Sequence, residues 1–377
     1  MFICLNIYLD GDNMTDREKE ILNILKEDPM ISQQDLADKL AITRSSVAVH
    51  ITNLMKKGYI KGKGYILNNG SYVTVIGGSN IDIQGCPNDN LVMFDSNPGV
   101  VEVSLGGVGR NIADNMARLD ISTKLISAVG NDVYGTQILY ESKSYGIDVD
   151  DVYISNEYPT SMYVSILNGE NDMQVAISHM DILSKIDVNY ISSVYKNINN
   201  SKAIVVDTNL SKEVIEYITS TFKDIPIFVD TVSTSKCMKI KDILNHFHTI
   251  KMNKYEAEAL SQIKINDLDD LHSCSQFFLD QGVSNVFITL GGDGVYCAKA
   301  NENCHIKGVK IDIVNATGAG DAFTAGLVYS FINDFDLKYS AKFSMGASLI
   351  ALSHEKTINP NLSIKNVEKI LEDMKLC

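Results

Sequence analysis

Apolar and polar positions follow two different periods along this chain. In residues 14–68 the apolar side chains recur every three or four positions, as in Ile21 and Leu25, which is the spacing of a helix with one buried face. From residue 72 onward, short β-branched runs that end in glycine or polar residues alternate with helical stretches. The pattern predicts a small helical domain over 14–68 and a larger α/β domain over 72–377.

The first domain is expected to hold three helices and a hairpin. Thr15 or Asp16, Ser32 and Thr43 precede the three amphipathic stretches as N-caps, and residues 59–67 have the pattern of a strand, a basic turn and a second strand. This order resembles the winged helix-turn-helix of many bacterial regulators. We expect DNA contacts from the third helix and the basic turn, through Arg44, Ser45, Ser46, His50, Lys61 and Lys63. A basic solvated hairpin or a protein-docking module is the alternative.

The second domain is predicted to be a mostly parallel sheet with helices on both faces. The expected strands are 72–77, 123–129, 203–207, 227–230, 249–252 and 286–291. The expected helices are 110–119, 135–145, 212–222, 254–261, 268–282 and 319–333. Ligands bind such sheets at the carboxyl ends of the strands.

Two further stretches alternate with period two and predict half-exposed strands of a small β lid, about 83–105 and 161–178. A strand over 310–314 is expected to lead into the turn Thr317–Asp321, TGAGD, which opens the helix over 319–333. Backbone N–H groups at a helix N-terminus bind anions, and a carboxylate beside them can accept a proton. The turn therefore predicts phosphoryl transfer to a hydroxyl group.

Charge separates the two domains. Residues 14–70 carry nine Lys/Arg and seven Asp/Glu, whereas the rest of the chain is strongly acidic and the total formal charge is −14. This sum argues against nucleic-acid binding over the whole surface. The seven scattered cysteines predict reduced thiols, no apolar run is long enough for a membrane span, and we expect a cytoplasmic protein. Residues 1–13 are interpreted as an upstream extension of a chain that could equally start at Met14.

Five stretches in order carry a resemblance that covers roughly residues 72–372. They are SNID (79–82), GGVGRNIA (106–113), NKYE (253–256), TLGGDG (289–294) and TGAGD (317–321). Together they resemble the ribokinase-like carbohydrate and nucleoside kinases, the PfkB family. The resemblance implies the ribokinase-like fold with a β lid, and ATP-dependent phosphorylation of an alcohol.

A narrower resemblance points to the bacterial pseudouridine kinases. It rests on SNPG (96–99), on Asn315 before TGAGD, and on NPNLSI (359–364). Most of the wider family has Asp where this chain has Asn315, beside a monovalent-cation site, so potassium activation is in doubt. The resemblance implies pseudouridine as the acceptor, while another nucleoside or a sugar remains open.

The resemblance also assigns roles to residues. Asp321 would be the general base, and Gly318, Ala319 and Gly320 would form the anion hole. The acceptor would be bound by Asn80, Asp82, Gly107, Arg110, Asn111, Ser161 and Tyr163. ATP would be bound by Asn253, Thr289, Gly291, Gly292, Gly294 and Thr317, and Mg²⁺ by Asn253 and Glu256.

Less specific interpretations remain for several of these residues. Asp82 could cap a turn, and Asn253 with Glu256 could form a helix-capping box. The family's lid strands often pair between subunits, so a homodimer is expected. A transcription regulator that uses the kinase fold as a ligand sensor is the alternative from another functional class.

Overall fold

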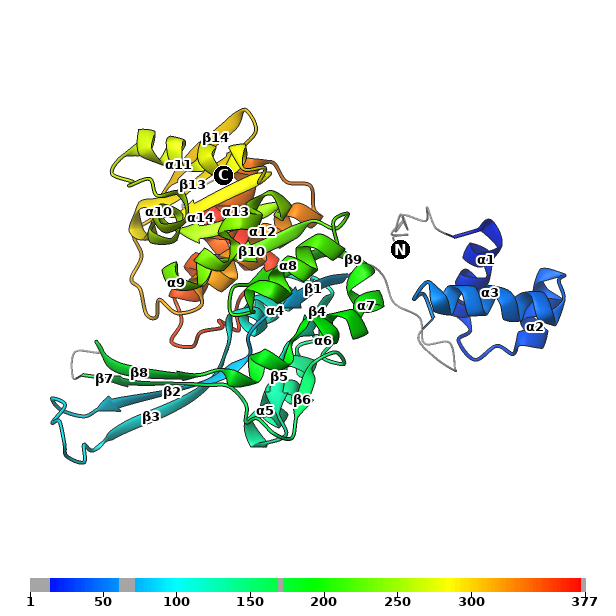
Figure 1. Cartoon of the computed structure of the whole chain (residues 1–377), viewed down its shortest axis with the longest axis horizontal. Helices are drawn as coiled ribbons and strands as arrows, with labels where there is room; N and C mark the ends of the chain where they lie inside the picture. Colours follow the sequence, from blue (N-terminus) through cyan, green and yellow to red (C-terminus); the bar gives the residue numbers. More distant parts are fainter. Residues whose placement is uncertain (1–13, 61–71, 169–171, 374–377) are drawn as a thin grey trace. The chain divides into compact units, whose positions relative to one another are not determined.

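A computed structural model of the chain describes residues 14–60, 72–168 and 172–373. The chain divides into two compact units, residues 1–71 with 196–200 and residues 72–195 with 201–377 (Figure 1). Each unit has its own cluster of buried apolar side chains. Within the described ranges, no helix is both long and apolar enough to cross a membrane.

The first unit contains the three predicted helices, α1 (Asp16–Glu27), α2 (Gln33–Leu40) and α3 (Arg44–Lys56). Each starts at the expected cap, because the hydroxyls of Thr15, Ser32 and Thr43 accept a backbone N–H three residues later. Their apolar faces meet in one core that includes Leu25, Leu36 and Leu54. The predicted hairpin over 59–67 lies mostly outside the described residues, as do Lys61 and Lys63.

The second unit is built on an eight-stranded sheet of order β14-β13-β12-β11-β10-β9-β1-β4. Its strands are β1 (Tyr72–Ile76), β4 (Thr123–Ile126), β9 (Ser201–Asp207), β10 (Ile227–Asp230), β11 (Thr249–Asn253), β12 (Asn285–Thr289), β13 (Gly294–Lys299) and β14 (Glu302–Lys307). The strands from β4 to β12 in this order are parallel, and β13 and β14 add an antiparallel edge. The prediction of a mostly parallel sheet is confirmed.

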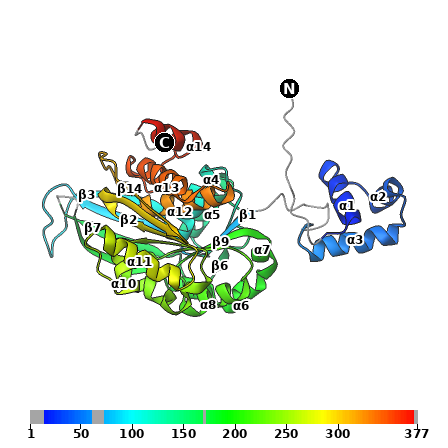
Figure 2. The same cartoon turned by 90° about the horizontal axis from the view of Figure 1, so that it is seen from above.

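Helices cover both faces of this sheet, as predicted (Figure 2). One face carries α4 (Val108–Arg118), α12 (Ala319–Ile332) and α13 (Leu337–Leu352), and α14 (Ile364–Asp373) packs on α13. The other face carries α6 (Val188–Ser193), α8 (Lys212–Thr221), α10 (Lys254–Ser261) and α11 (Leu268–Asp280). The remaining elements are α5 (Val133–Ser144), α7 (Tyr195–Asn199), α9 (Thr234–Cys237), the pair β5 (Ala128–Gly130) and β6 (Tyr153–Ser155), and 3₁₀ segments at Asp181–Lys185, Met238–His246 and Gly291–Asp293.

A second sheet, the lid sheet, projects from the main body in the order β3-β2-β7-β8 (Figure 1). Its strands are β2 (Asn80–Pro87), β3 (Gly99–Gly106), β7 (Met162–Leu167) and β8 (Met173–His179). The register places Val103, Ile83, Val164 and Ile177 side by side, and Ser104, Asp82, Tyr163 and Ser178 in the next row. Because neighbouring positions along a strand point to opposite faces, the lid sheet has one apolar and one polar face.

Two expectations from the sequence are wrong. Residues 310–314 form no strand, because no neighbouring strand pairs with them; Ile313 and Val314 are instead exposed on a loop. Cys297 and Cys304 stand opposite each other in β13 and β14 and form a disulfide, so they are not the free thiols that were expected.

Candidate functional site

The carboxyl ends of the parallel strands bring four polar residues to one edge of the main sheet. Asp207 ends β9, Asp230 ends β10, Asn253 ends β11 and Thr289 ends β12. The N-terminus of α12 contributes Asp321 to the same group, since Asp207 and Asp230 both act electrostatically on its carboxyl group. This is the edge at which open α/β sheets bind ligands.

The glycine-rich turn before α12 is held in place on both sides. Gly318 has a positive φ of 83°, and a Cβ there would collide with the carbonyl oxygen of Thr357, so the turn requires glycine. Asn315 accepts a hydrogen bond from the Thr317 N–H (2.9 Å) and donates one to the Glu355 carbonyl (2.7 Å). These contacts fix the loop whose N–H groups begin the helix.

Asp321 is buried, with 8% of its surface exposed, and its carboxylate accepts a hydrogen bond from Asn111 Nδ2 on α4 (2.8 Å). Burial raises the pKa of this carboxyl to about 7, and the negative charge of Asp230 adds to the effect. The Asn111 hydrogen bond and the charge of Lys251 act in the opposite direction. A carboxyl group with this pKa can take up and release a proton near neutral pH.

A buried ion pair that was not expected from the sequence lies next to the turn. Lys251 Nζ lies 3.1 Å from Asp230 Oδ2, which also accepts a hydrogen bond from Thr324 on α12 (2.9 Å). A Cβ on Gly320 would lie 2.7 Å from Lys251 Nζ, so the ammonium group packs against the glycine turn. A lysine inside the apolar run TIKM was the available signal in the sequence.

Arg110 lies behind Asn111, with only 2% of its surface exposed. Its guanidinium group donates to Asn111 Oδ1 (2.6 Å), to Asp114 Oδ2 (3.2 Å) and to the carbonyl oxygens of Leu105 and Gly106 (both 3.2 Å). The N–H groups of Arg110 that make these hydrogen bonds all point to acceptors within the protein.

The residues expected to bind the acceptor gather where the lid sheet meets α4. Asn80 Nδ2 donates to Asp82 Oδ1 (2.6 Å), and Asp82 is paired in register with Tyr163. Burial raises the pKa of the Asp82 carboxyl, although Asn80 and the positive charge of Arg110 oppose the shift. The buried Ser161 hydroxyl has no hydrogen-bond partner among the described residues.

Gly107 forms the junction between the lid sheet and α4. Its φ is 95°, and a Cβ would overlap the Gly78 carbonyl oxygen and lie 2.5 Å from the Ser79 Cα. The Arg110 N–H donates to the same Gly78 carbonyl (3.1 Å). Glycine at this position therefore lets the start of α4 approach the loop after β1.

Asn253 and Glu256 form the capping box that the sequence analysis named as an alternative. The Asn253 side chain accepts the Glu256 N–H, and Glu256 accepts the Asn253 N–H and also the Thr231 hydroxyl (2.6 Å). One carboxylate and one amide suit Mg²⁺, which is held by few protein oxygens together with water and phosphate. In the part of the chain that the structure describes, no three His, Cys, Asp or Glu side chains converge as a metal cluster.

The remaining residues of the expected nucleotide loop follow β12. Thr289 donates its hydroxyl to the Met252 carbonyl (3.3 Å). Gly291 and Gly292 face open space, whereas Gly294, with φ 97°, packs against the backbone at Ile306. The loop therefore presents bare backbone to solvent beside the end of β11.

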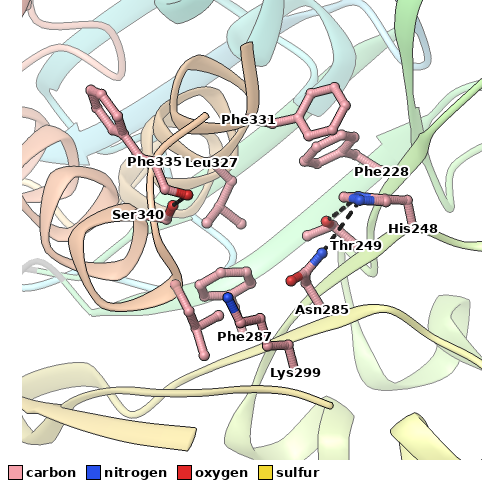
Figure 3. Close-up of a pocket in the computed structure, with 11 residues that line it drawn as sticks. Phe228, His248, Thr249, Asn285, Phe287, Lys299, Leu327, Phe331, Phe335 and Ser340 are labelled. Atoms are coloured by element: carbon pink, nitrogen blue, oxygen red, sulfur yellow. Dashed lines mark hydrogen bonds between the residues drawn. The ribbon is translucent and has the colours of Figure 1, made fainter. Parts of the chain in front are cut away.

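A small pocket lies at the opposite edge of the sheet (Figure 3). Its lining includes Thr249 and Asn285, which begin β11 and β12, and the rings of Phe228, Phe331 and His248. Its volume of about 80 Å³ is well below the roughly 300–1,000 Å³ of ordinary ligand sites. The pocket is separate from the group around Asp321, because it lies at the starts of β11 and β12 and that group lies at the ends of the strands.

Four of the expected DNA-contacting residues lie on α3 of the first unit. Arg44 and Ser45 are exposed, and Ser46 and His50 are partly exposed. The hydroxyl of Thr43 interacts with those of both Ser45 (2.9 Å) and Ser46 (2.8 Å). Arg44 is therefore an exposed residue at the capped start of α3. In helix-turn-helix proteins the N-terminal residues of the recognition helix are the ones that meet base edges.

Comparison with known protein families gives two matches. Residues 71–364 match the model described as pfkB family carbohydrate kinase, and residues 14–61 match the model described as winged helix-turn-helix DNA-binding. Both resemblances inferred from the sequence are thereby confirmed.

Individual relatives and a solved structure are also named as kinases. The chain is 40% identical to the pseudouridine kinase of Escherichia coli over 80% of this chain and 97% of the relative. It is 37% identical to the E. coli protein named uncharacterized sugar kinase YeiI over 94% of this chain and 98% of that one, so this alignment extends into the residues before Tyr72. A crystal structure titled as a putative sugar kinase from Clostridium perfringens superposes with a TM-score of 0.74 at 36% identity, covering 81% of this chain and 97% of the other.

The raised pKa of Asp321 predicts a pH-dependent stability. Between the ordinary Asp pKa near 4 and about 7, the folded state binds the proton more tightly than the unfolded state, so this carboxyl group destabilises the fold increasingly as the pH rises. We expect Asp321→Asn to raise the melting temperature relative to wild type at pH 8, and to raise it less at pH 5. Scanning calorimetry from pH 5 to 9 measures this difference, with the exposed Asp312→Asn as control; a difference that grows toward acid pH would contradict the prediction.

Proposed function

Because the chain belongs to the pfkB family of carbohydrate kinases, we propose that its second unit transfers the γ-phosphoryl group of ATP to the 5′-hydroxyl of pseudouridine. The identity of 40% to the E. coli pseudouridine kinase supports this acceptor. The observation that carries the proposal is the buried Asp321 at the start of α12, hydrogen-bonded to Asn111 and preceded by a turn of bare backbone.

In the proposed mechanism the 5′-oxygen attacks the γ-phosphorus in line, and the bond between that phosphorus and the β–γ bridging oxygen breaks. Asp321 accepts the hydroxyl proton, and ADP leaves. The N–H groups of Gly318, Ala319 and Gly320 stabilise the charge on the transferring group. Lys251, packed against this turn, places a positive charge beside the same group.

The acceptor residues are proposed to act from two sides. Asp82 and Asn80 hydrogen-bond the ribose hydroxyls from the lid sheet, and Asn111 does so from α4 with its second Nδ2 hydrogen. A carboxylate suits a diol because it can accept two hydrogen bonds. Ser161 and Tyr163, from β7 and the residue before it, contact the base, and Gly107 allows the backbone to approach the sugar.

ATP is proposed to lie along the ends of β11 and β12. Asn253 and Glu256 hold Mg²⁺, which when bound neutralises charge on the phosphates. Thr289, Gly291, Gly292 and Gly294 line the nucleotide, and Thr317 contacts phosphate. The exposed glycines suit this role, because they offer N–H groups without side chains in the way.

Phosphorylation assays test this proposal. Purified protein with ATP and Mg²⁺ is expected to phosphorylate pseudouridine in strong preference to uridine, inosine and ribose. The Asp321→Asn variant is expected to lose at least about 100-fold in kcat, because general base catalysis contributes about 10²–10⁴. Preferred activity on uridine, inosine or ribose would keep the mechanism and replace pseudouridine as the proposed substrate. Absence of activity on any of them, with ATP still bound, would favour a ligand sensor on the kinase fold.

The apolar face of the lid sheet supports a homodimer. Val101 and Val103 on β3 and Val175 and Ile177 on β8 are each more than half exposed, although they belong to the apolar rows of the register. Exposed apolar strands of this kind are usually covered by a partner. A second copy with the same face satisfies this requirement symmetrically.

We therefore expect the protein to be a dimer at micromolar concentration, by sedimentation or light scattering. The double variant Val101→Glu/Ile177→Glu is expected to be monomeric, because it places charges on the apolar face. Tyr140→Glu, an exposed position on α5, is the matched control and is expected to leave the dimer intact. A wild-type protein that is monomeric at tens of micromolar would contradict the proposal.

The first unit is proposed to bind DNA and so to couple the nucleoside to regulation of transcription. The winged helix-turn-helix match and the exposed Arg44 at the start of α3 support this role. A dimer would present two such units to two half-sites. A regulator that also catalyses the reaction is compatible with both proposals.

DNA binding is expected to be measurable with a random duplex at low salt and to weaken as salt increases. On this random duplex Arg44→Ala should reduce affinity by about tenfold and lower the slope of log K against log salt by about one, because one cation that neutralises phosphate charge is lost. Lys19→Ala, on the exposed side of α1, is the control with the same loss of charge. Equal affinities of the two variants would place the DNA contact elsewhere.

A further inference from the structure

We propose that Arg110 is a positioning residue that fixes the orientation of the Asn111 side-chain amide, so that this amide donates its hydrogen bond to Asp321. The inference rests on the proposed function and deepens it, because it concerns Asn111, the residue hydrogen-bonded to the proposed general base Asp321. It also replaces the direct acceptor contact that the sequence predicts for Arg110.

The polarity of the Asn111 amide follows from the chemistry of arginine. A guanidinium group has five N–H donors and no acceptor, so the atom of Asn111 that faces Arg110 Nη2 at 2.6 Å must be the oxygen. The NH₂ end then necessarily points to Asp321 Oδ2, at 2.8 Å. With a neutral partner in place of Arg110, the amide could turn over and accept a hydrogen bond from a protonated Asp321.

This orientation matters because negative charges surround Asp321. Asp207 on β9 and Asp230 on β10 oppose its ionisation, as does burial, whereas Lys251 on β11 and the Asn111 N–H favour it. Arg110 on α4 also interacts with the Asp321 charge. A base must be ionised to accept a proton, so a donor fixed toward its carboxylate favours the reactive form.

Arg110 is itself held by a ladder of charges along one side of α4. Arg110, Asp114 and Arg118 are spaced four residues apart, and Asp114 accepts hydrogen bonds from Arg110 Nη1 (3.2 Å) and from Arg118 Nε (2.7 Å). Arg118 reaches the carbonyl of Pro360 (3.3 Å) and the ring of Tyr145. The negative charge of Asp114 thus balances the positive charge of the buried Arg110, and Asp114 also forms an ion pair with Arg118.

A purely structural role for Arg110 is the competing explanation, since it also binds the carbonyls of Leu105 and Gly106. The two explanations differ in their effect on the proton affinity of Asp321. A structural role changes stability at every pH alike, whereas the positioning role changes the pH at which Asp321 ionises.

The test uses the full-length protein and needs no acceptor. The difference in melting temperature between each protein and its counterpart with Asp321→Asn is measured from pH 5 to 10. This difference stops growing at the pH where folded Asp321 is ionised. In an Arg110→Gln background we expect that pH to rise by at least one unit. In an Asn111→Ala background we expect Arg110→Gln to add no such rise, because positioning acts through the amide whereas the charge of Arg110 acts on Asp321 directly. In Arg110→Lys, which retains a donor-only cation, and in Arg118→Gln, the matched neutralisation two turns along α4, we expect no such rise.

A second arm measures kcat against pH with saturating ATP and pseudouridine. Arg110→Gln is expected to lose about fivefold or more at pH 7 and to recover at high pH, because a one-unit rise from a pKa of about 7 lowers the ionised fraction of Asp321 by about that factor. If Arg110→Gln does not fold, Arg110→Gln/Asp114→Asn, which removes both charges of the buried pair, takes its place in both arms. An unchanged ionisation pH, or loss of fold in both variants, overturns the positioning role. An inactive wild type overturns the proposed kinase function alone, because the melting arm still decides this inference.

Discussion

A buried hydrogen bond between Asn111 and Asp321 joins the two halves of the proposed site in the second unit. It joins α4, which follows the lid sheet, to α12, which begins at the glycine turn, across 210 residues of sequence. The two helices also pack against each other on one face of the sheet. In the proposed mechanism α4 lies on the acceptor side and α12 carries the general base and the anion turn, so this contact links the two sides of the reaction.

Features that depend on a few neighbouring residues could be predicted from the sequence. The caps Thr15, Ser32 and Thr43 are local hydrogen bonds, and the buried strands from β9 to β12 are continuous apolar runs. The expected strand over 310–314 is wrong for the corresponding reason. A strand needs a partner, and the alternating pattern of KIDIV does not show that β14 already ends the sheet.

The charged neighbours of the site could not be predicted in the same way. The pairing of Lys251 with Asp230 depends on β10 lying beside β11 and on α12 crossing both strand ends. The direction of the Arg110 side chain depends on Asp114, one turn further along α4. The candidate groups of the reaction can therefore be found along the chain, whereas the contacts that set their protonation and orientation depend on the folded arrangement.

The long separation between Asn111 and Asp321 also orders events during synthesis. The ribosome releases α4 and the strands that carry Asp207, Asp230 and Lys251 well before α12, so three buried charges must await the helix that completes their surroundings. The helices of the first unit contact one another over short sequence distances and can form their core as soon as they emerge. A nascent chain therefore carries a folded helix-turn-helix while the proposed phosphoryl-transfer site is still incomplete.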